Sequence, residues 1–217
     1  MTREGFADLL FAHTSLLCPA ACPEIQTREA TSLIPLWEAA EKLAGAQVEP
    51  PFWAYSWPGG QALARYILDQ PEVVRAKAVL DLGCGNGIAA IAAWLAGASR
   101  VMANDIDPAA IWMAEINSAE NGVRVELCLE DLLLADPPVP PFQVLLAGDL
   151  FYAKEMAARV EAWLREAVGL GGEVLVGDPS RTYVPREGLR LLTSYEIAVS
   201  PEIEGVSLRG TRVLRME

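Results

Sequence analysis

The sequence is poor in basic residues. Its 217 residues include 17 lysines and arginines against 29 aspartates and glutamates, which gives a formal net charge of −12. Because affinity for nucleic acid depends on cations that neutralise phosphates, this balance argues against a nucleic-acid partner. An acidic surface favours a cationic ligand or a basic patch on a protein, but it can equally serve only to keep the chain in solution.

Long apolar runs and cysteines are also scarce. No stretch reaches the ~18 unbroken apolar residues of a membrane span, and an early acid makes a secretory signal at the N-terminus unexpected. Four cysteines are too few for a disulfide scaffold, so we expect a reducing, cytoplasmic location and no membrane contact. Cys18, Cys22 and His13 would supply only three zinc ligands, which favours ordinary thiols and no metal site.

Strand-like and helical segments alternate along most of the chain. The expected strands cover 78–82, 100–104, 123–128, 144–147, 173–176, 195–200 and 207–216, and the expected helices cover 61–69, 88–96, 108–121, 154–168 and 186–193. This alternation predicts an α/β, doubly wound, mostly parallel sheet of seven strands. The last two strands are joined by only a few residues, so they are expected to form an antiparallel hairpin.

The N-terminal part reads differently. Residues 1–60 are expected to form a helical extension with an aromatic segment, and 61–217 the cofactor-binding domain. Within the extension, 27–45 is interpreted as a helical stretch that the interior Pro35 splits or kinks. In the aromatic segment, Trp57 is expected to line the cofactor pocket and Trp53 to pack in the core.

A glycine-rich loop, residues 81–87 (Asp-Leu-Gly-Cys-Gly-Asn-Gly), follows the first strand of the sheet. Glycines such as Gly83 and Gly85 let the chain turn sharply and let a ligand approach the backbone. In open α/β sheets that ligand binds beyond the carboxyl ends of the strands. The spacing does not exclude a dinucleotide, but the Asp81 carboxylate would repel pyrophosphate and suits the ammonium of a methionine moiety. The loop therefore favours S-adenosylmethionine.

Acids follow the next two strands. Asp105 can accept hydrogen bonds from both ribose hydroxyls, whereas Asp107 is expected to cap the helix that begins at Pro108. Asp131 could accept from the adenine amino group while Leu132 packs on the ring, although a solvated loop acid explains Asp131 equally well. These residues complete the expected cofactor site.

The fourth strand ends in Gly148, Asp149 and, three positions later, Tyr152. This end faces the glycine loop across the sheet, so a methyl acceptor should meet the cofactor here. Asp149 could hold an ammonium and Tyr152 could wall the channel and orient the nitrogen, or Asp149 could instead cap the following helix. After the fifth strand, Asp178 or Arg181 could contact substrate or form a structural ion pair.

Together these motifs resemble the seven-stranded protein-lysine methyltransferases. The segments that carry the resemblance are 51–60, 79–87, 105–108, 148–152 and 177–181. Over almost its full length the chain is similar to bacterial relatives of the electron-transfer flavoprotein β-subunit lysine methyltransferase.

The resemblance implies transfer of methyl groups from S-adenosylmethionine to lysines of a protein partner, with the flavoprotein β-subunit as the implied substrate. It places Gly83 and Gly85 along the methionine part of the cofactor, Asp105 on the ribose and Gly148 beside the cofactor. It places Asp149 and Tyr152 on the substrate side, as the implied catalytic residues.

One departure from the family pattern is Ser180, where glycine is expected, so the substrate-side loop could differ in shape. Several readings remain open. The acceptor could be another protein, such as a ribosomal one, or a small amine. The chain could also bind the cofactor without catalysis, or be a nucleotide-dependent oxidoreductase. We expect a monomer.

Overall fold

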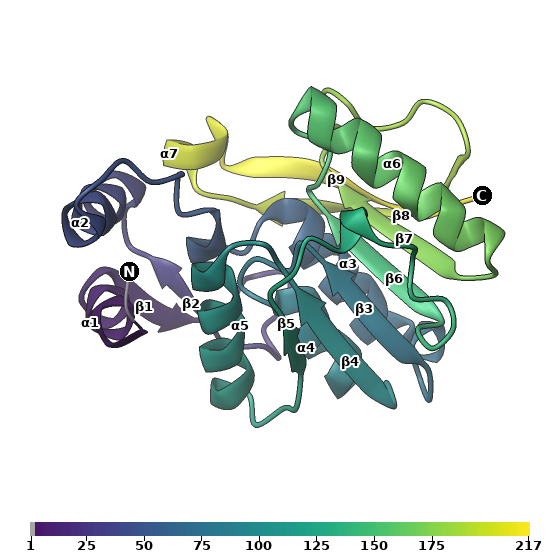
Figure 1. Ribbon diagram of the computed structural model, residues 1–217, viewed down its shortest axis with the longest axis horizontal. Coiled ribbons are helices and arrows are strands. Elements are labelled where there is room, and N and C mark those ends of the chain that lie inside the picture. Colours follow the sequence, from purple (N-terminus) through teal and green to yellow (C-terminus); the bar gives the residue numbers. More distant parts are fainter. Residues whose placement is uncertain (1–2) are drawn as a thin grey trace.

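A computed structural model describes residues 3–217 and is built on a central seven-stranded sheet (Figure 1). The strand order is β5-β4-β3-β6-β7-β9-β8. The strands are β3 (Ala78–Leu82), β4 (Arg100–Asn104), β5 (Glu126–Cys128), β6 (Val144–Gly148), β7 (Glu173–Asp178), β8 (Leu189–Ala198) and β9 (Leu208–Met216). The five neighbouring strands β5, β4, β3, β6 and β7 run parallel, and β9 pairs antiparallel with both β7 and β8. The fold class expected from the sequence is confirmed.

Helices cover both faces of the sheet. They are α3 (Pro58–Asp69), α4 (Ile88–Leu95), α5 (Pro108–Glu120), α6 (Lys154–Gly169) and the short α7 (Pro201–Glu204). On one face α3 and α4 bury Val79 and Leu146, and on the other α6 buries Leu80 and Leu145 (Figure 1). Strands buried on both faces need continuous apolar runs, which is why β3 and β6 could be found in the sequence.

The order of strands reverses beside β3. The chain adds β4 and then β5 on one side of β3, and returns to place β6 on the other side. Loops that leave β3 and β6 therefore diverge and open a crevice at their carboxyl ends, where ligands of doubly wound sheets bind.

The prediction of one helical stretch over 27–45 is wrong. Thr27–Ala30 is strand β2, which pairs antiparallel with β1 (Thr14–Leu17), and helix α2 covers only Leu33–Ala44. Pro35 lies in the first turn of α2, where a missing N–H breaks no intrahelical bond, so it starts the helix instead of kinking it.

The prediction of a helix over 186–193 is also wrong, because β8 occupies Leu189–Ala198. Its register with β9 shifts between Leu191 and Thr193, which obscures the two-residue alternation that marks a strand. The segment that joins β8 to β9 contains α7.

The N-terminal elements pack at one end of the sheet, beside α5 (Figure 1). Phe6 of α1 (Arg3–His13), Leu36 of α2 and Trp53 of the 3-10 turn η1 (Phe52–Ala54) share a cluster with Met113 of α5. Trp53 is thus confirmed as a core residue, and the division of the chain at residue 60 stays a proposal. Within residues 3–217, no helix combines the length and the apolar character that crossing a bilayer requires.

Candidate active site

A cavity of about 1140 Å³ opens at the crevice beside β3. Its floor includes Gly83 and Gly85 of the glycine loop and Gly148 at the end of β6. Its walls come from segments far apart in the sequence, including the aromatic segment before α3 and the α7 segment. The cavity exceeds the 300–1,000 Å³ of ordinary small-molecule sites, so it can hold a cofactor together with part of an acceptor.

The glycine loop presents bare backbone to this cavity. Gly83 and Gly85 have φ of +64° and +54°, a region that favours glycine. A Cβ on Gly85 would have no atom within 4 Å, so the loop leaves open space where a ligand can lie against the main chain.

Asp105 is fixed beside the loop by two main-chain donors. Its Oδ2 accepts from the N–H of Gly85 at 3.0 Å, and its Oδ1 accepts from the N–H of Asp107 at 3.0 Å. Burial raises the pKa of its carboxyl. Each carboxylate oxygen has a second lone pair, so Asp105 can still accept from two hydroxyls. Asp107 accepts from the N–H of Ala109 at 2.8 Å, which confirms its prediction as the helix cap.

Asp131 and Leu132 both line the cavity after β5. Asp131 also caps a short 3-10 turn through the N–H of Leu133 and pairs with Arg159 at 2.9 Å. Ile106, which was not expected from the sequence, also lines the cavity and has 70% of its surface exposed. The pattern that could have indicated Ile106 is an apolar residue between two acids in a loop.

Asp81 lies beneath the loop and is not among the described residues that line the cavity. It is only 3% exposed, and its Oδ2 accepts from the N–H of Ala90 at 3.0 Å. Burial raises the pKa of Asp81 to about 7. Its contact supports the first turn of α4, and its proposed attraction for an ammonium stays a prediction.

Asp149 follows β6 and lines the cavity, and both of its carboxylate oxygens accept hydrogen bonds. Its Oδ2 accepts from the N–H groups of Gly59 at 2.5 Å and Gly60 at 3.3 Å, in the first turn of α3. Its Oδ1 accepts from Nε and Nη2 of Arg181 at 3.1 and 2.8 Å. The cap of α6 is Ala153, with no side-chain hydrogen bond, so the capping alternative for Asp149 is wrong.

The environment of Asp149 explains its electrostatics. It is 8% exposed, and burial raises its pKa to about 6 although Arg181 opposes that shift. Its φ of +58° is unusual for a residue other than glycine. Strained backbone of this kind persists where surrounding contacts hold it, often at functional sites.

Arg181 joins Asp149 to α7. Its Nη2 also lies 2.8 Å from Oε1 of Glu204, and Arg209 pairs with the same glutamate at 2.7 Å. The sequence left Arg181 either as a substrate contact or as part of a structural ion pair. The structure shows ion pairs of Arg181 with Asp149 and Glu204, and all three residues line the cavity. The preceding Ser180 has φ +67°, so the loop keeps a glycine-like backbone without the glycine expected there. The sequence around Glu204 did not indicate that this residue lines the cavity.

An aromatic wall faces these charges. The rings of Phe52 and Tyr152 lie 5.8 Å apart, and those of Phe52 and Trp57 lie 5.9 Å apart. The guanidinium of Arg181 lies 5.7 Å from the centre of the Trp57 ring. Trp57 and Tyr152 both line the cavity, as expected from the sequence.

Comparison with known proteins agrees with this geometry. A family model described as ribosomal protein L11 methyltransferase (PrmA) matches residues 61–150. The electron transfer flavoprotein β-subunit lysine methyltransferase of Xenopus laevis is 37% identical over 216 residues, covering 97% of this chain and 86% of its own length. That of Danio rerio is 38% identical over 198 residues, covering 89% and 76%.

A more distant relative is the ribosomal protein L11 methyltransferase of Geobacter sulfurreducens, 38% identical over 65% of this chain and 46% of its own. Among solved structures, the magnesium protoporphyrin IX methyltransferase of Synechocystis with bound S-adenosylmethionine shares the fold, with a TM-score of 0.53 and 17% identity over 72% of this chain and 78% of that one. The chain belongs to the electron transfer flavoprotein β-subunit lysine methyltransferase family and is an S-adenosylmethionine-dependent protein-lysine methyltransferase.

Proposed function

We propose that this enzyme methylates a lysine of an electron transfer flavoprotein β-subunit. The observation that carries the proposal is the Asp149 carboxylate, held at the cavity wall by two N–H groups and Arg181. The similarity to flavoprotein lysine methyltransferases extends over nearly the whole chain, whereas the similarity to ribosomal protein L11 methyltransferases is shorter. The expected cytoplasmic location and monomeric state remain predictions.

The cofactor side of the site is assigned to the floor of the cavity. Gly83, Gly85 and Gly148 would lie along the cofactor, because all three line this cavity and Gly85 has open space beside its main chain. Asp105 would accept from the ribose, and Asp131 and Leu132 would border the adenine. Trp57 would close the same space. When bound, S-adenosylmethionine supplies a methyl group on a sulfonium sulfur.

The acceptor side is assigned to Asp149, Tyr152 and Arg181. A lysine must lose its proton before its nitrogen has a free lone pair. A lone buried carboxylate would favour the charged ammonium, because an opposite charge stabilises the ionised form. Since Arg181 already neutralises Asp149, and the four hydrogen bonds to Asp149 occupy its acceptor positions, the pair would shape the acceptor side without holding the nitrogen as a cation. Tyr152 walls this side of the cavity.

The test is transfer of label from S-adenosylmethionine to a purified flavoprotein β-subunit, followed by mass spectrometry of its peptides. We expect methyl groups on one or more lysines. Ribosomal protein L11 and simple alkylamines are assayed in parallel. Label on either of these with none on the flavoprotein would contradict the proposed substrate.

Replacing Asp105 by asparagine should weaken cofactor binding. A hydrogen bond to a charged group contributes roughly 1.5–3 kcal/mol, so we expect affinity for S-adenosylhomocysteine to fall by a factor on the order of 10 to 100. Isothermal titration calorimetry measures this directly. Glu130→Gln, which removes a nearby exposed charge outside the cavity lining, is the matched control, and equal affinities for both variants would refute the role of Asp105.

A further inference from the structure

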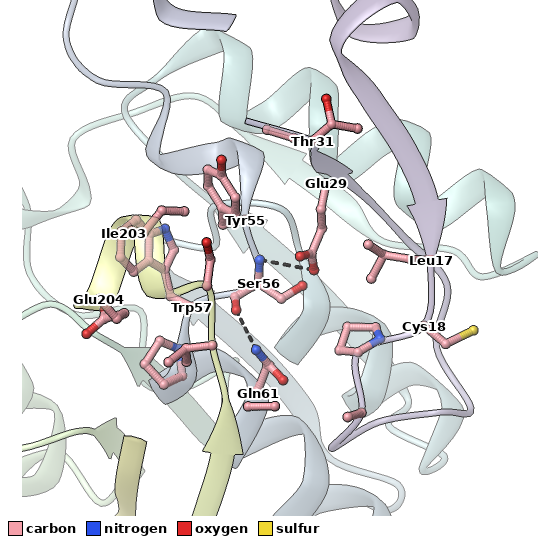
Figure 2. A pocket seen from close by; sticks show the side chains of 17 residues that line it. Leu17, Cys18, Glu29, Thr31, Tyr55, Ser56, Trp57, Gln61, Ile203 and Glu204 are labelled. Atoms are coloured by element: carbon pink, nitrogen blue, oxygen red, sulfur yellow. Dashed lines mark hydrogen bonds between the residues drawn. The ribbon is translucent and has the colours of Figure 1, made fainter. Parts of the chain in front are cut away.

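Figure 2 shows a second cavity, of about 300 Å³. It is lined by the turn after β1, by β2, by the aromatic segment and by the segment that leads into α7. Trp57, Ile203 and Glu204 line both cavities, so the two share a wall. Its volume is at the lower limit for small-molecule sites, which suits a single side chain.

Glu29 is the distinctive group of this cavity. Figure 2 shows its carboxylate among the labelled residues, where Oε1 accepts from the N–H of Ser56 at 3.2 Å. The same oxygen accepts from the hydroxyl of Thr27 at 3.0 Å. Both donors are neutral, and no cation within residues 3–217 forms a salt bridge with Glu29. Burial raises the pKa of its carboxyl.

The arginines near this cavity form ion pairs with other carboxylates. Arg28, the neighbour of Glu29, pairs with Glu120 and lies over the ring of Phe11. On the other side of the shared wall, Arg181 and Arg209 both pair with Glu204. A partly buried carboxylate without a cationic partner is costly, and an incoming cation would relieve that cost.

The remaining walls suit a cation. Tyr55 and Trp57 contribute aromatic surface, which attracts lysine and especially arginine side chains. Burial, together with the charges of Glu202 and Glu29, raises the pKa of Tyr55 to about 12, so its hydroxyl stays protonated. The acidic balance of the whole chain, −12, adds a long-range attraction for a basic partner.

We propose that this cavity binds a second basic side chain of the protein substrate, an arginine or lysine whose cation pairs with Glu29 while the target lysine enters the cofactor cavity. The shared wall places the two side chains within reach of one folded partner. The proposal rests on the proposed function only in requiring a protein acceptor.

The site is also connected to the cofactor loop. The hydroxyl of Ser56 accepts from Nδ2 of Asn86 at 2.7 Å, and Gln61 donates to the carbonyl of Ser56 at 2.6 Å. A purely structural role for Glu29 would act through this connection and would change cofactor affinity. The test must therefore separate the charge of Glu29 from its hydrogen bonds.

Glu29→Gln makes that separation, because its amide oxygen can still accept from Ser56 and Thr27. We expect its KM for the protein that the wild type labels to rise about tenfold, the effect of losing roughly 1.4 kcal/mol, with unchanged kcat. Glu166→Gln, on the exposed face of α6, is the charge-matched control and should behave as wild type. Affinity for S-adenosylhomocysteine should be equal in all three proteins.

A probe tests the subsite without an acceptor protein. N-acetyl-L-arginine amide should raise the melting temperature of the wild type and of Glu166→Gln, but not that of Glu29→Gln. Loss of this shift with an unchanged KM would mean that the cavity binds a free small cation, and it would overturn the proposal. Reduced cofactor affinity in Glu29→Gln, or no change in any measurement, would overturn it as well. A wild type that labels no protein would contradict the proposed function, while the shift would still report the subsite.

Discussion

Replacing Asp149 by asparagine is expected to lower kcat/KM by a factor on the order of 10² to 10⁴. Asparagine keeps the shape and can still accept from Gly59 and Gly60, but it no longer pairs with Arg181. Removing one partner of a buried ion pair costs roughly 3–5 kcal/mol, which corresponds to this factor if the loss falls on the transition state. Steady-state kinetics with the methylated protein measures it.

A control variant and a binding measurement distinguish a loss of catalysis from a loss of folding. Asp136→Asn changes an exposed carboxylate in a loop and should leave the kinetics unchanged. Affinity for S-adenosylhomocysteine should survive in Asp149→Asn, because Asp149 lies on the acceptor side. A variant whose kcat/KM stays close to that of the wild type would show that the acceptor does not need the carboxylate.

Replacing Gly177 by alanine is expected to destabilise the whole fold. A Cβ there would overlap the carbonyl oxygen of Gly59 and lie 2.8 Å from Cγ of Leu63. The first turn of α3 and strand β7 approach backbone to backbone at this point, so no flexible side chain can move aside. Overpacking of this kind costs about 3 kcal/mol, which lowers the melting temperature of a domain of this size by roughly 6–12 °C.

Gly169→Ala is the matched control for that experiment. A Cβ on Gly169, in the last turn of α6, has no atom within 4 Å. Alanine favours helix over glycine, so this variant should melt at or slightly above the wild-type temperature. Equal melting temperatures for Gly177→Ala and the wild type would contradict the close approach of α3 to β7.

The sequence alone determined the features that depend on local patterns. Buried parallel strands need mostly apolar runs, so β3 and β6 could be located, and the glycine loop at the end of β3 indicated the cofactor. A helix cap satisfies donors two residues away, so Asp107 could be assigned from its own neighbourhood. The strand over Thr27–Ala30 escaped because it is short and polar, and only its pairing with β1 makes it a strand.

Only the tertiary structure decided the partners of Asp149. The motif placed the carboxylate at the end of β6, but its hydrogen bonds come from Gly59, Gly60 and Arg181, and Glu204 holds that arginine from α7. These groups are far apart in the chain and meet because α3, β6 and β7 pack closely at their glycines. Sequence periodicity reports which face of an element is buried, but it does not report which distant charge will lie opposite. The ion pair between Asp149 and Arg181, and the position of Glu29 beside the shared wall, are therefore products of packing.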